Sequence, residues 1–198
     1  MAAFDLVLRG KRVITRAGEV PRCIAVRDGV VVAIEPLESR LEGAETVDLA
    51  DDEVLLPGLV DSHVHVNEPG RTEWEGFATA TRAAAAGGVT TILDMPLNSI
   101  PPTTTVDGLE VKRKAAQDSA HVDVGFWGGA VPGNIDDLRG LHDAGVFGFK
   151  CFMTDSGVEE FPHLTAADFA AAMAETARLG ALMIVHAEDG DAIAACAH

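Results

Sequence analysis

Residues 4–56 alternate between short apolar runs and polar breaks, which is the pattern of short β-strands joined by turns. The runs FDLVLRG, KRVIT, CIAVRDGVVVAIEP and ETVDLADDEVLL are rich in Val, Ile and Leu, residues that suit a strand. Asp28 and Gly29 separate two of these apolar runs, and an Asp-Gly step is a strong signal for a β-hairpin. We therefore predict a small β module over residues 1–56, forming part of a composite β-sandwich.

From residue 57 to residue 198 the pattern changes to strand, turn and helix in repetition. Each predicted strand is a near-continuous apolar run, as expected of a parallel strand buried on both faces. The predicted strands cover residues 54–65, 89–96, 121–129, 146–153 and 181–189, and the predicted helices cover residues 74–88, 105–118, 135–145 and 165–180. Thr165 and Gly180 are typical capping residues for the last of these helices. The alternation predicts an α/β domain with right-handed crossovers.

Two α/β architectures fit this alternation: an open doubly wound sheet and a (β/α)8 barrel. The glycine-rich dinucleotide-binding fingerprint is absent after the first strand, which weakens the doubly wound alternative. Polar residues recur where the strands end, and barrels build their active sites at that end. These residues are Asp61, His63, His65, Asp94, Lys150, His186 and Glu188. We predict an incomplete (β/α)8 barrel that contains strands 1–5.

Five strands of a closed barrel leave two edges with unpaired backbone groups. We therefore expect a fragment, a truncated gene model or a chain that another polypeptide completes. The net charge of -16 disfavours nucleic acid and anionic membranes as partners, because like charges repel. Three widely spaced cysteines are not a disulfide framework, and no apolar run reaches the ~20 residues that span a bilayer. We expect a cytoplasmic protein.

The first candidate for chemistry is the pair His63 and His65, at the end of the first α/β strand. Alternate residues of a strand point to the same face, so both imidazoles can converge on one point. Neutral imidazole is a common ligand of Zn, Fe and Co. Two polar residues at a junction between strand and loop give the same pattern, so the pair alone leaves metal binding open.

Lys150 and His186 are the other candidate ligands. Lys150 lies between two phenylalanines in the apolar run GFKCF, so it either reaches solvent or is buried with a lowered pKa. A free amine can react with carbon dioxide to give an anionic carbamate that bridges two metals. His186 ends the fifth strand. Together with His63 and His65, these residues predict a binuclear metal site at one end of the barrel.

The blocks NEPGRTEWEGF (67–77) and DMPLNSIPPTT (94–104) closely resemble the allantoinase group of the amidohydrolase superfamily. PGLVDSHVH (57–65), GFKCFMTDSGVEEFPHL (148–164) and VHAED (185–189) are similar to further signatures of this group. The resemblance implies that His63 and His65 bind the more buried metal and that His186 binds the second. It also implies that carbamylated Lys150 bridges two divalent ions, zinc first, with iron, cobalt or manganese as alternatives. The general-base aspartate of the group is expected beyond residue 198.

Asn67 and Asn98 are the candidate substrate contacts. Related dihydroorotases carry Arg two residues after the second histidine, where this chain has Asn67. An amide lacks the charged fork that favours a carboxylate but can hydrogen-bond a neutral ureido group. Both asparagines could instead cap loops.

The resemblance implies hydrolysis of a cyclic amide, with ring opening of allantoin to allantoate in purine catabolism. It also implies a homo-oligomer, a tetramer, for the full-length enzyme. The alternatives are a hydantoinase or dihydropyrimidinase, and a catalytically inactive truncated homologue that acts as a scaffold. The Asn67–Arg71 block disfavours the first alternative. The set of His63, His65, Lys150 and His186 disfavours the second.

Overall fold

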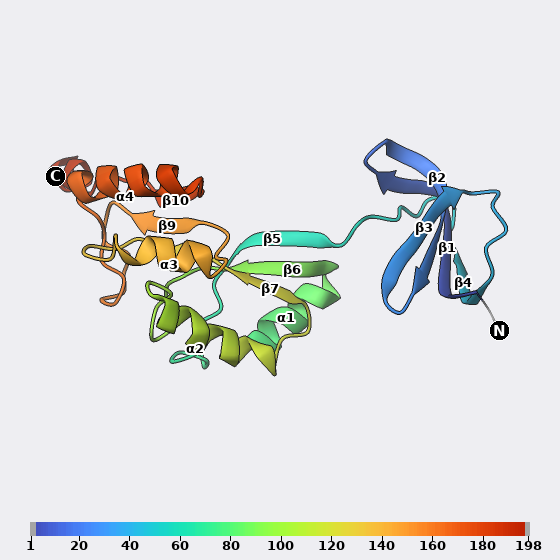
Figure 1. Ribbon diagram of the computed structural model, residues 1–198, viewed down its shortest axis with the longest axis horizontal. Coiled ribbons are helices and arrows are strands. Elements are labelled where there is room, and N and C mark those ends of the chain that lie inside the picture. The colour runs from blue at the N-terminus through green and yellow to red at the C-terminus, as the bar shows by residue number, and fades with distance from the viewer. Residues whose placement is uncertain (1–2, 197–198) are drawn as a thin grey trace. The chain divides into compact units, whose positions relative to one another are not determined.

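The computed structural model describes residues 3–196 and divides into two compact units, Met1–Gly58 and Leu59–His198 (Figure 1). Unit 1 holds β1 (Phe4–Thr15), β2 (Gly18–Arg27), β3 (Val30–Pro36) and β4 (Gly43–Asp48). These strands form one sheet in the order β3-β2-β1-β4. The pairs β1–β2 and β2–β3 are antiparallel, whereas β1–β4 is parallel.

The predicted hairpin at Asp28 and Gly29 is confirmed. Both residues have positive φ, at 52° and 75°, and Arg27 pairs with Val30 across the turn. Two positive φ values give the turn whose twist matches the flanking strands, and Asp-Gly adopts them at low cost.

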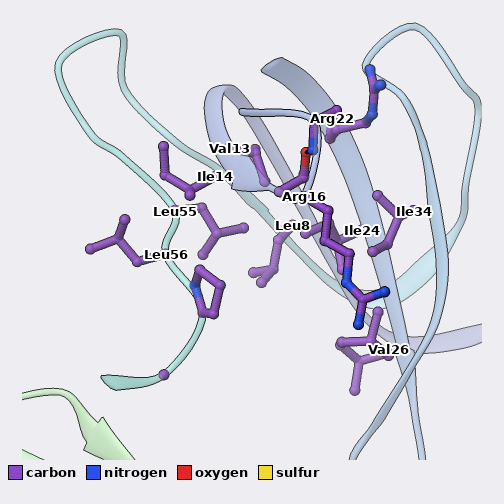
Figure 2. A pocket seen from close by; sticks show the side chains of 15 residues that line it. Leu8, Val13, Ile14, Arg16, Arg22, Ile24, Val26, Ile34, Leu55 and Leu56 are labelled. Atoms are coloured by element: carbon purple, nitrogen blue, oxygen red, sulfur yellow. Dashed lines mark hydrogen bonds between the residues drawn. The ribbon is translucent and has the colours of Figure 1, made fainter. Parts of the chain in front are cut away.

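One face of the unit 1 sheet is buried and the other is hollowed. Val7, Cys23 and Ala25 are fully buried and make a small core with Phe4, Ala33 and Leu41 packed against it. The alternate residues of the same strands, among them Leu8, Ile24 and Val26, line an apolar groove of about 670 Å³ (Figure 2). The four strands of unit 1 form one sheet, and the composite β-sandwich expected from the sequence stays a prediction.

Unit 2 alternates strands and helices along its whole described length. The strands are β5 (Leu59–Val64), β6 (Val89–Asp94), β7 (Asp123–Phe126), β8 (Gly128–Gly129), β9 (Phe149–Phe152) and β10 (Met183–His186). The helices are α1 (Phe77–Ala86), α2 (Val106–Gln117), α3 (Asp137–Asp143), α4 (Ala166–Leu179) and α5 (Gly190–Cys196). All strand pairs are parallel, in two sheets of order β5-β6-β7 and β8-β9-β10. The predicted α/β class is confirmed.

The two sheets meet at Trp127, the residue between β7 and β8. Its backbone N–H donates to Asp94 O at 2.9 Å, and the N–H of the next residue, Gly128, donates to Gly148 O at 2.9 Å. The strands therefore follow one another in sequence order. Helices α1 to α4 form a row in which each contacts the next (Figure 1). Their inner faces and the strands enclose a core that includes Phe77, Leu109 and Phe149.

The helix caps show why the helices lie where the sequence predicts. Thr105 accepts a hydrogen bond from Gly108 N and begins α2, and Thr165 accepts one from Asp168 N and begins α4. Each side-chain oxygen satisfies an N–H that the first turn leaves unpaired. Gly180 ends α4 in the left-handed region, with φ 67°. The predicted caps at Thr165 and Gly180 are confirmed.

Several predicted boundaries are wrong, and the predicted strand 121–129 is two strands, β7 and β8, which lie in different sheets. The segments FDLVLRG and KRVIT are one strand, β1, with an irregular register between Gly10 and Val13. The first strand of unit 2 begins at Leu59, although the apolar run begins at residue 54. Leu55 instead bridges to Val13 of β1, and its N–H donates to Arg12 O at 2.9 Å. Of the helices in residues 3–196, none has the length and apolar character needed to cross a lipid bilayer.

Candidate metal and substrate site

The two histidines of the first α/β strand are neighbours. His63 lies in β5, and His65 directly follows its last residue. Their ring centroids are 5.4 Å apart, with 49° between the ring planes. His65 is exposed, yet its pKa is lowered to about 4, first by desolvation from the protein atoms around it and then by the nearby charges of His63, Lys150 and Lys112. His65 is therefore neutral near pH 7, and neutral imidazole is the form that binds a metal.

Lys150 is buried in β9, with 6% of the residue exposed. Burial lowers the pKa of its amine. The amine Nζ lies 4.7 Å from the ring centroid of Phe152 and has no carboxylate within 4.0 Å among the ion pairs of the described residues. A buried cation without a counter-charge is unfavourable, so the uncharged amine is promoted. This is the form that reacts with carbon dioxide.

Lys112, on α2, is also fully buried but has a partner that sequence reasoning missed. Its Nζ lies 2.8 Å from Asp94 Oδ2 and donates to Met95 O at 2.8 Å. Asp94 ends β6 with none of its side chain exposed, and desolvation raises its pKa to about 6 against the opposing effect of Lys112. The signal was present in the sequence, because Lys112 falls at helical spacing between the buried residues Leu109 and Ala116.

The carboxylate of Asp94 also holds the backbone beside the histidines. Its Oδ1 accepts a hydrogen bond from Val66 N at 2.7 Å. Val66 is fully buried and stands between His65 and Asn67. The buried pair of Asp94 and Lys112 therefore fixes the segment that carries one candidate ligand and one candidate substrate contact. The sequence placed Asp94 only among the polar residues at the strand ends; the structure shows that its Oδ1 contacts the backbone of Val66.

The two candidate substrate contacts, Asn67 and Asn98, follow neighbouring strands. Asn67 is 8% exposed, and its Oδ1 is buried with no hydrogen-bond partner among the residues described. Asn98 Nδ2 lies 3.5 Å from His65 Nδ1, at the limit of a hydrogen bond. Asn98 has a positive φ of 72°, a conformation that asparagine tolerates better than most residues. The Asn67 side chain thus presents an acceptor without a protein donor.

His186 ends β10 and remains apart from the histidine pair. Its ring stacks on Phe152 at 5.1 Å between centroids, and its Nε2 lies 3.3 Å from Glu188 Oε2. Backbone register pairs His186 with Phe152 on β9, two residues beyond Lys150. Within residues 3–196, no three His, Cys, Asp or Glu side chains lie close enough together to hold a metal ion. His186 therefore does not join His63 and His65 in such a group.

The donors fit a divalent metal in their chemistry. The pair of His63 and His65 offers imidazole nitrogens, and Lys150 offers an amine whose pKa is lowered by burial. These residues lie on or directly after parallel strands, and the carboxyl ends of parallel strands all lie at the same end of the α/β unit. A parallel α/β unit with histidines and a buried lysine at its strand ends is typical of metal-dependent hydrolases.

The signature of the amidohydrolase family matches residues 54–198. The chain belongs to the amidohydrolase family. Within it, the chain is 61% identical to an allantoinase of Streptomyces avermitilis over 98% of its own length and 44% of the relative's. It is 48% identical to the mitochondrial allantoinase of Aquarana catesbeiana, over 92% of this chain and 38% of that protein. The chain thus spans less than half of the length of the curated relatives it matches.

Solved structures of hydantoinases share the fold. The L-hydantoinase (dihydropyrimidinase) of Arthrobacter aurescens superimposes with a TM-score of 0.88 at 36% identity, over 97% of this chain and 42% of that one. A D-hydantoinase of a Bacillus species gives a TM-score of 0.78 at 28% identity, over 96% of this chain and 41% of that one. The parallel arrangement of unit 2 is therefore that of known cyclic amidohydrolases.

Proposed function

We propose that this chain supplies part of a metal-dependent hydrolase that opens the ring of allantoin to give allantoate. The 61% identity to an allantoinase over 98% of the chain carries the proposal. The identity extends to kingdoms far apart, with 52% to an allantoinase of Saccharomyces cerevisiae over 82% of this chain. The site adds chemical support, because the lowered pKa of His65 favours the neutral imidazole that binds metals. Burial also lowers the pKa of Lys150, which favours the free amine over the ammonium ion.

For the architecture, we propose that residues 57–198 carry the first five strands of a (β/α)8 barrel: β5, β6, β7 together with β8, β9 and β10. The unbroken parallel order and the match to hydantoinases support this reading. For residues 1–56 we propose one layer of a β-sandwich. The apolar groove over Leu8, Ile24 and Val26 supports it, since a second β layer would remove this surface from water (Figure 2).

For the metal centre, we propose His63, His65, Lys150 and His186 as protein ligands, with carbamylated Lys150 as the bridge. The bound group would be two divalent ions, zinc first, with iron, cobalt or manganese as alternatives; it would lower the pKa of a water and polarise the ring carbonyl. Burial of Lys150 favours the amine that carbon dioxide attacks. Desolvation is the first cause of the lowered pKa of His65, and the neutral ring that it favours is available as a ligand.

For the substrate, we propose that Asn67 and Asn98 hydrogen-bond the neutral ureido and ring amide groups. Asn67 Oδ1 has no partner in the described chain and can accept from a ligand N–H. The nearby cation Arg71 is bound to Glu160, with 2.5 Å between Nη1 and Oε1. Because that charge is already neutralised, this arrangement favours an uncharged ring over a carboxylate-bearing one.

A hydantoinase or dihydropyrimidinase activity is the second candidate. The TM-score of 0.88 to an L-hydantoinase favours it, although the 36% identity is well below the identity to allantoinases.

An inactive scaffold is the third candidate. It is favoured by the absence of a three-ligand cluster among residues 3–196.

For the full-length protein we further propose a cytoplasmic homo-tetramer that acts on allantoin, with neither nucleic acid nor membrane as partner.

The test is allantoin hydrolysis by a chimera in which this chain replaces the aligned part of the Streptomyces avermitilis allantoinase. We expect the chimera to hydrolyse allantoin faster than hydantoin. A His63→Ala/His65→Ala chimera should lose the activity, whereas a His121→Ala chimera, altered at an exposed histidine elsewhere, should keep it. Preference for hydantoin would support the second candidate. A folded chimera that hydrolyses neither compound would reject the enzymatic reading of this chain.

A further inference from the structure

Arg71 makes side-chain contacts with two segments far away in sequence. Its Nη1 donates to Asn98 O at 2.8 Å and to Glu160 Oε1 at 2.5 Å, and its Nη2 donates to Glu160 Oε2 at 3.3 Å. The side chains of Arg71 and Glu160 are 18% and 21% exposed. A two-pronged pair of charges that is mostly shielded from water is stronger and more directional than a surface ion pair.

These contacts join three loops that follow three different strands. Arg71 lies in the loop after β5 (residues 65–76), Asn98 in the loop after β6 (residues 95–105) and Glu160 in the loop after β9 (residues 153–165). Such loops carry the specificity of parallel α/β enzymes, because they surround the end at which the strands present their polar residues. One guanidinium therefore restrains three loops around the candidate site.

The loop after β5 is otherwise closed upon itself. Asn67 N donates to Glu75 O at 3.0 Å, and Arg71 N donates to Asn67 O at 3.0 Å. The Arg71 guanidinium also lies over the ring of Trp74, 5.0 Å from its centroid. Asn67 and Arg71 thus belong to one compact turn, in which the Arg71 backbone N–H is hydrogen-bonded to the Asn67 carbonyl.

The loops after β5 and β6 touch at backbone distance. Ile100 N donates to Pro69 O at 2.8 Å. Gly70 has φ 96°, and a Cβ at this position would lie 2.6 Å from Ile100 Cβ. Only glycine allows this approach without displacement of the neighbouring loop. The loops after β5 and β6 are therefore already in backbone contact, and the Arg71 side chain adds hydrogen bonds to the loops after β6 and β9.

Asn98 occupies the end of this chain of contacts. Its carbonyl is held by Arg71, and its side-chain Nδ2 lies 3.5 Å from His65 Nδ1. Its backbone has a positive φ of 72°, a conformation that asparagine adopts at lower cost than most residues. The direction of the Asn98 amide thus depends on a carbonyl that the guanidinium fixes.

We propose that Arg71 is a positioning residue that, through Glu160 and the Asn98 carbonyl, ties the three loops together and orients the amides of Asn67 and Asn98 toward a substrate. This role rests on the proposed function of the two asparagines as substrate contacts. Lysine would not replace Arg71, because one ammonium group cannot span both carboxylate oxygens and a carbonyl in the fixed geometry of the guanidinium fork.

The test uses the isotope-labelled chain and three variants. Arg71→Met keeps the apolar stem but removes all donors, Arg71→Lys keeps only the charge, and Glu160→Gln keeps the shape of the acceptor without its charge. Arg178→Met is the matched control, because Arg178 pairs with Glu175 on the surface of α4, 2.7 Å apart. Amide hydrogen exchange of Ile100 reports the contact between loops, and the side-chain NH2 resonances of Asn67 and Asn98 report their orientation.

We expect Arg71→Met to raise the exchange rate of the Ile100 amide by about tenfold or more and to shift both side-chain resonances. Arg71→Lys should resemble Arg71→Met more than wild type, Glu160→Gln should be intermediate, and Arg178→Met should match wild type. Unchanged exchange and unchanged resonances in Arg71→Met would overturn the positioning role.

Titration with allantoin in the presence of zinc separates this proposal from the proposed function. Weaker binding of allantoin by Arg71→Met, by about tenfold, with zinc binding unchanged would support both proposals. Altered exchange with unaltered allantoin affinity would overturn the role of Arg71 in substrate binding and leave the function intact. If the wild-type chain binds zinc but no allantoin, the substrate assignment fails on this chain, while exchange and the asparagine resonances still decide the positioning role.

Discussion

Replacement of Lys112 by methionine should destabilise unit 2 strongly. Methionine has about the volume of the lysine stem, so the change removes the charge without opening a large cavity. It leaves two buried acceptors, Asp94 Oδ2 and Met95 O, which Lys112 Nζ now contacts at 2.8 Å each. Loss of one partner of a fully buried ion pair costs about 3–5 kcal/mol, and we expect a loss within this range at pH 8.

The cost should fall at lower pH. Desolvation already raises the pKa of Asp94 to about 6, with Lys112 opposing the rise. Without Lys112 the pKa rises further, so at pH 5 the acid is neutral and needs no cation. The folded-state pKa then lies above the unfolded one, which means that the stabilising effect of protonation is present at low pH and is lost as the pH rises through the folded pKa.

Urea unfolding followed by tryptophan fluorescence measures this effect in unit 2 alone. Both tryptophans of the chain, Trp74 and Trp127, belong to unit 2, and a Trp74→Phe background leaves only the buried Trp127 as reporter. Lys114→Met, an exposed lysine two residues further along α2, is the matched control.

The double variant Asp94→Asn/Lys112→Met completes the thermodynamic cycle. The asparagine keeps an oxygen that can accept from Val66 N, so we expect the double variant to be more stable than Lys112→Met at pH 8. A loss below about 1 kcal/mol for Lys112→Met, equal at pH 5 and pH 8, would refute the buried ion pair.

Three further predictions follow from single contacts. Carbon-13 bicarbonate should give a carbamate resonance that Lys150→Met abolishes, because burial lowers the pKa of this amine; a signal that persists in the variant would exclude Lys150. The hydrogen bond from Arg71 lowers the pKa of Glu160, so its stabilising effect is present above the ordinary value of 4.5 and is lost as the pH falls through the lowered pKa. Wild type and Glu160→Gln should therefore differ in urea midpoint at pH 7 and converge as the pH falls below the lowered pKa, and a constant difference would argue against the pair. Asn134→Ala should cost about 2–3 kcal/mol in urea unfolding, because this 8% exposed side chain donates to Thr104 O and Gly129 O and accepts from Val131 N; a loss under 1 kcal/mol would contradict that network.

The sequence predicted the elements of unit 2 well because local signals agree with the fold there. The apolar runs over β6 and β10 are parallel strands, with β6 buried at its end and β10 half-buried, and Thr165 and Gly180 bound α4. The prediction failed at Leu55, which belongs to unit 1 and bridges to β1 there instead of opening the first strand of unit 2. A pattern of apolar residues alone does not show which unit an apolar residue near the boundary in sequence will join.

The candidate site was only partly visible in the sequence. Lys150 could be singled out because a charged residue within an apolar strand is locally anomalous, and the structure shows it buried. The pair of Arg71 and Glu160 joins residues 89 positions apart, and nothing in the local pattern of either marks it. Whether His186 completes the ligand set stays a prediction, since its ring stacks on Phe152 rather than beside His63.

The central claim is that this chain carries metal ligands of an amidohydrolase at the end of its first α/β strand. The most direct test is the zinc content of the purified chain, measured by plasma mass spectrometry after gel filtration. We predict that the wild-type chain and His121→Ala retain zinc and that His63→Ala/His65→Ala loses it. A wild-type chain that retains no zinc, or a double variant that retains as much as wild type, would contradict the account.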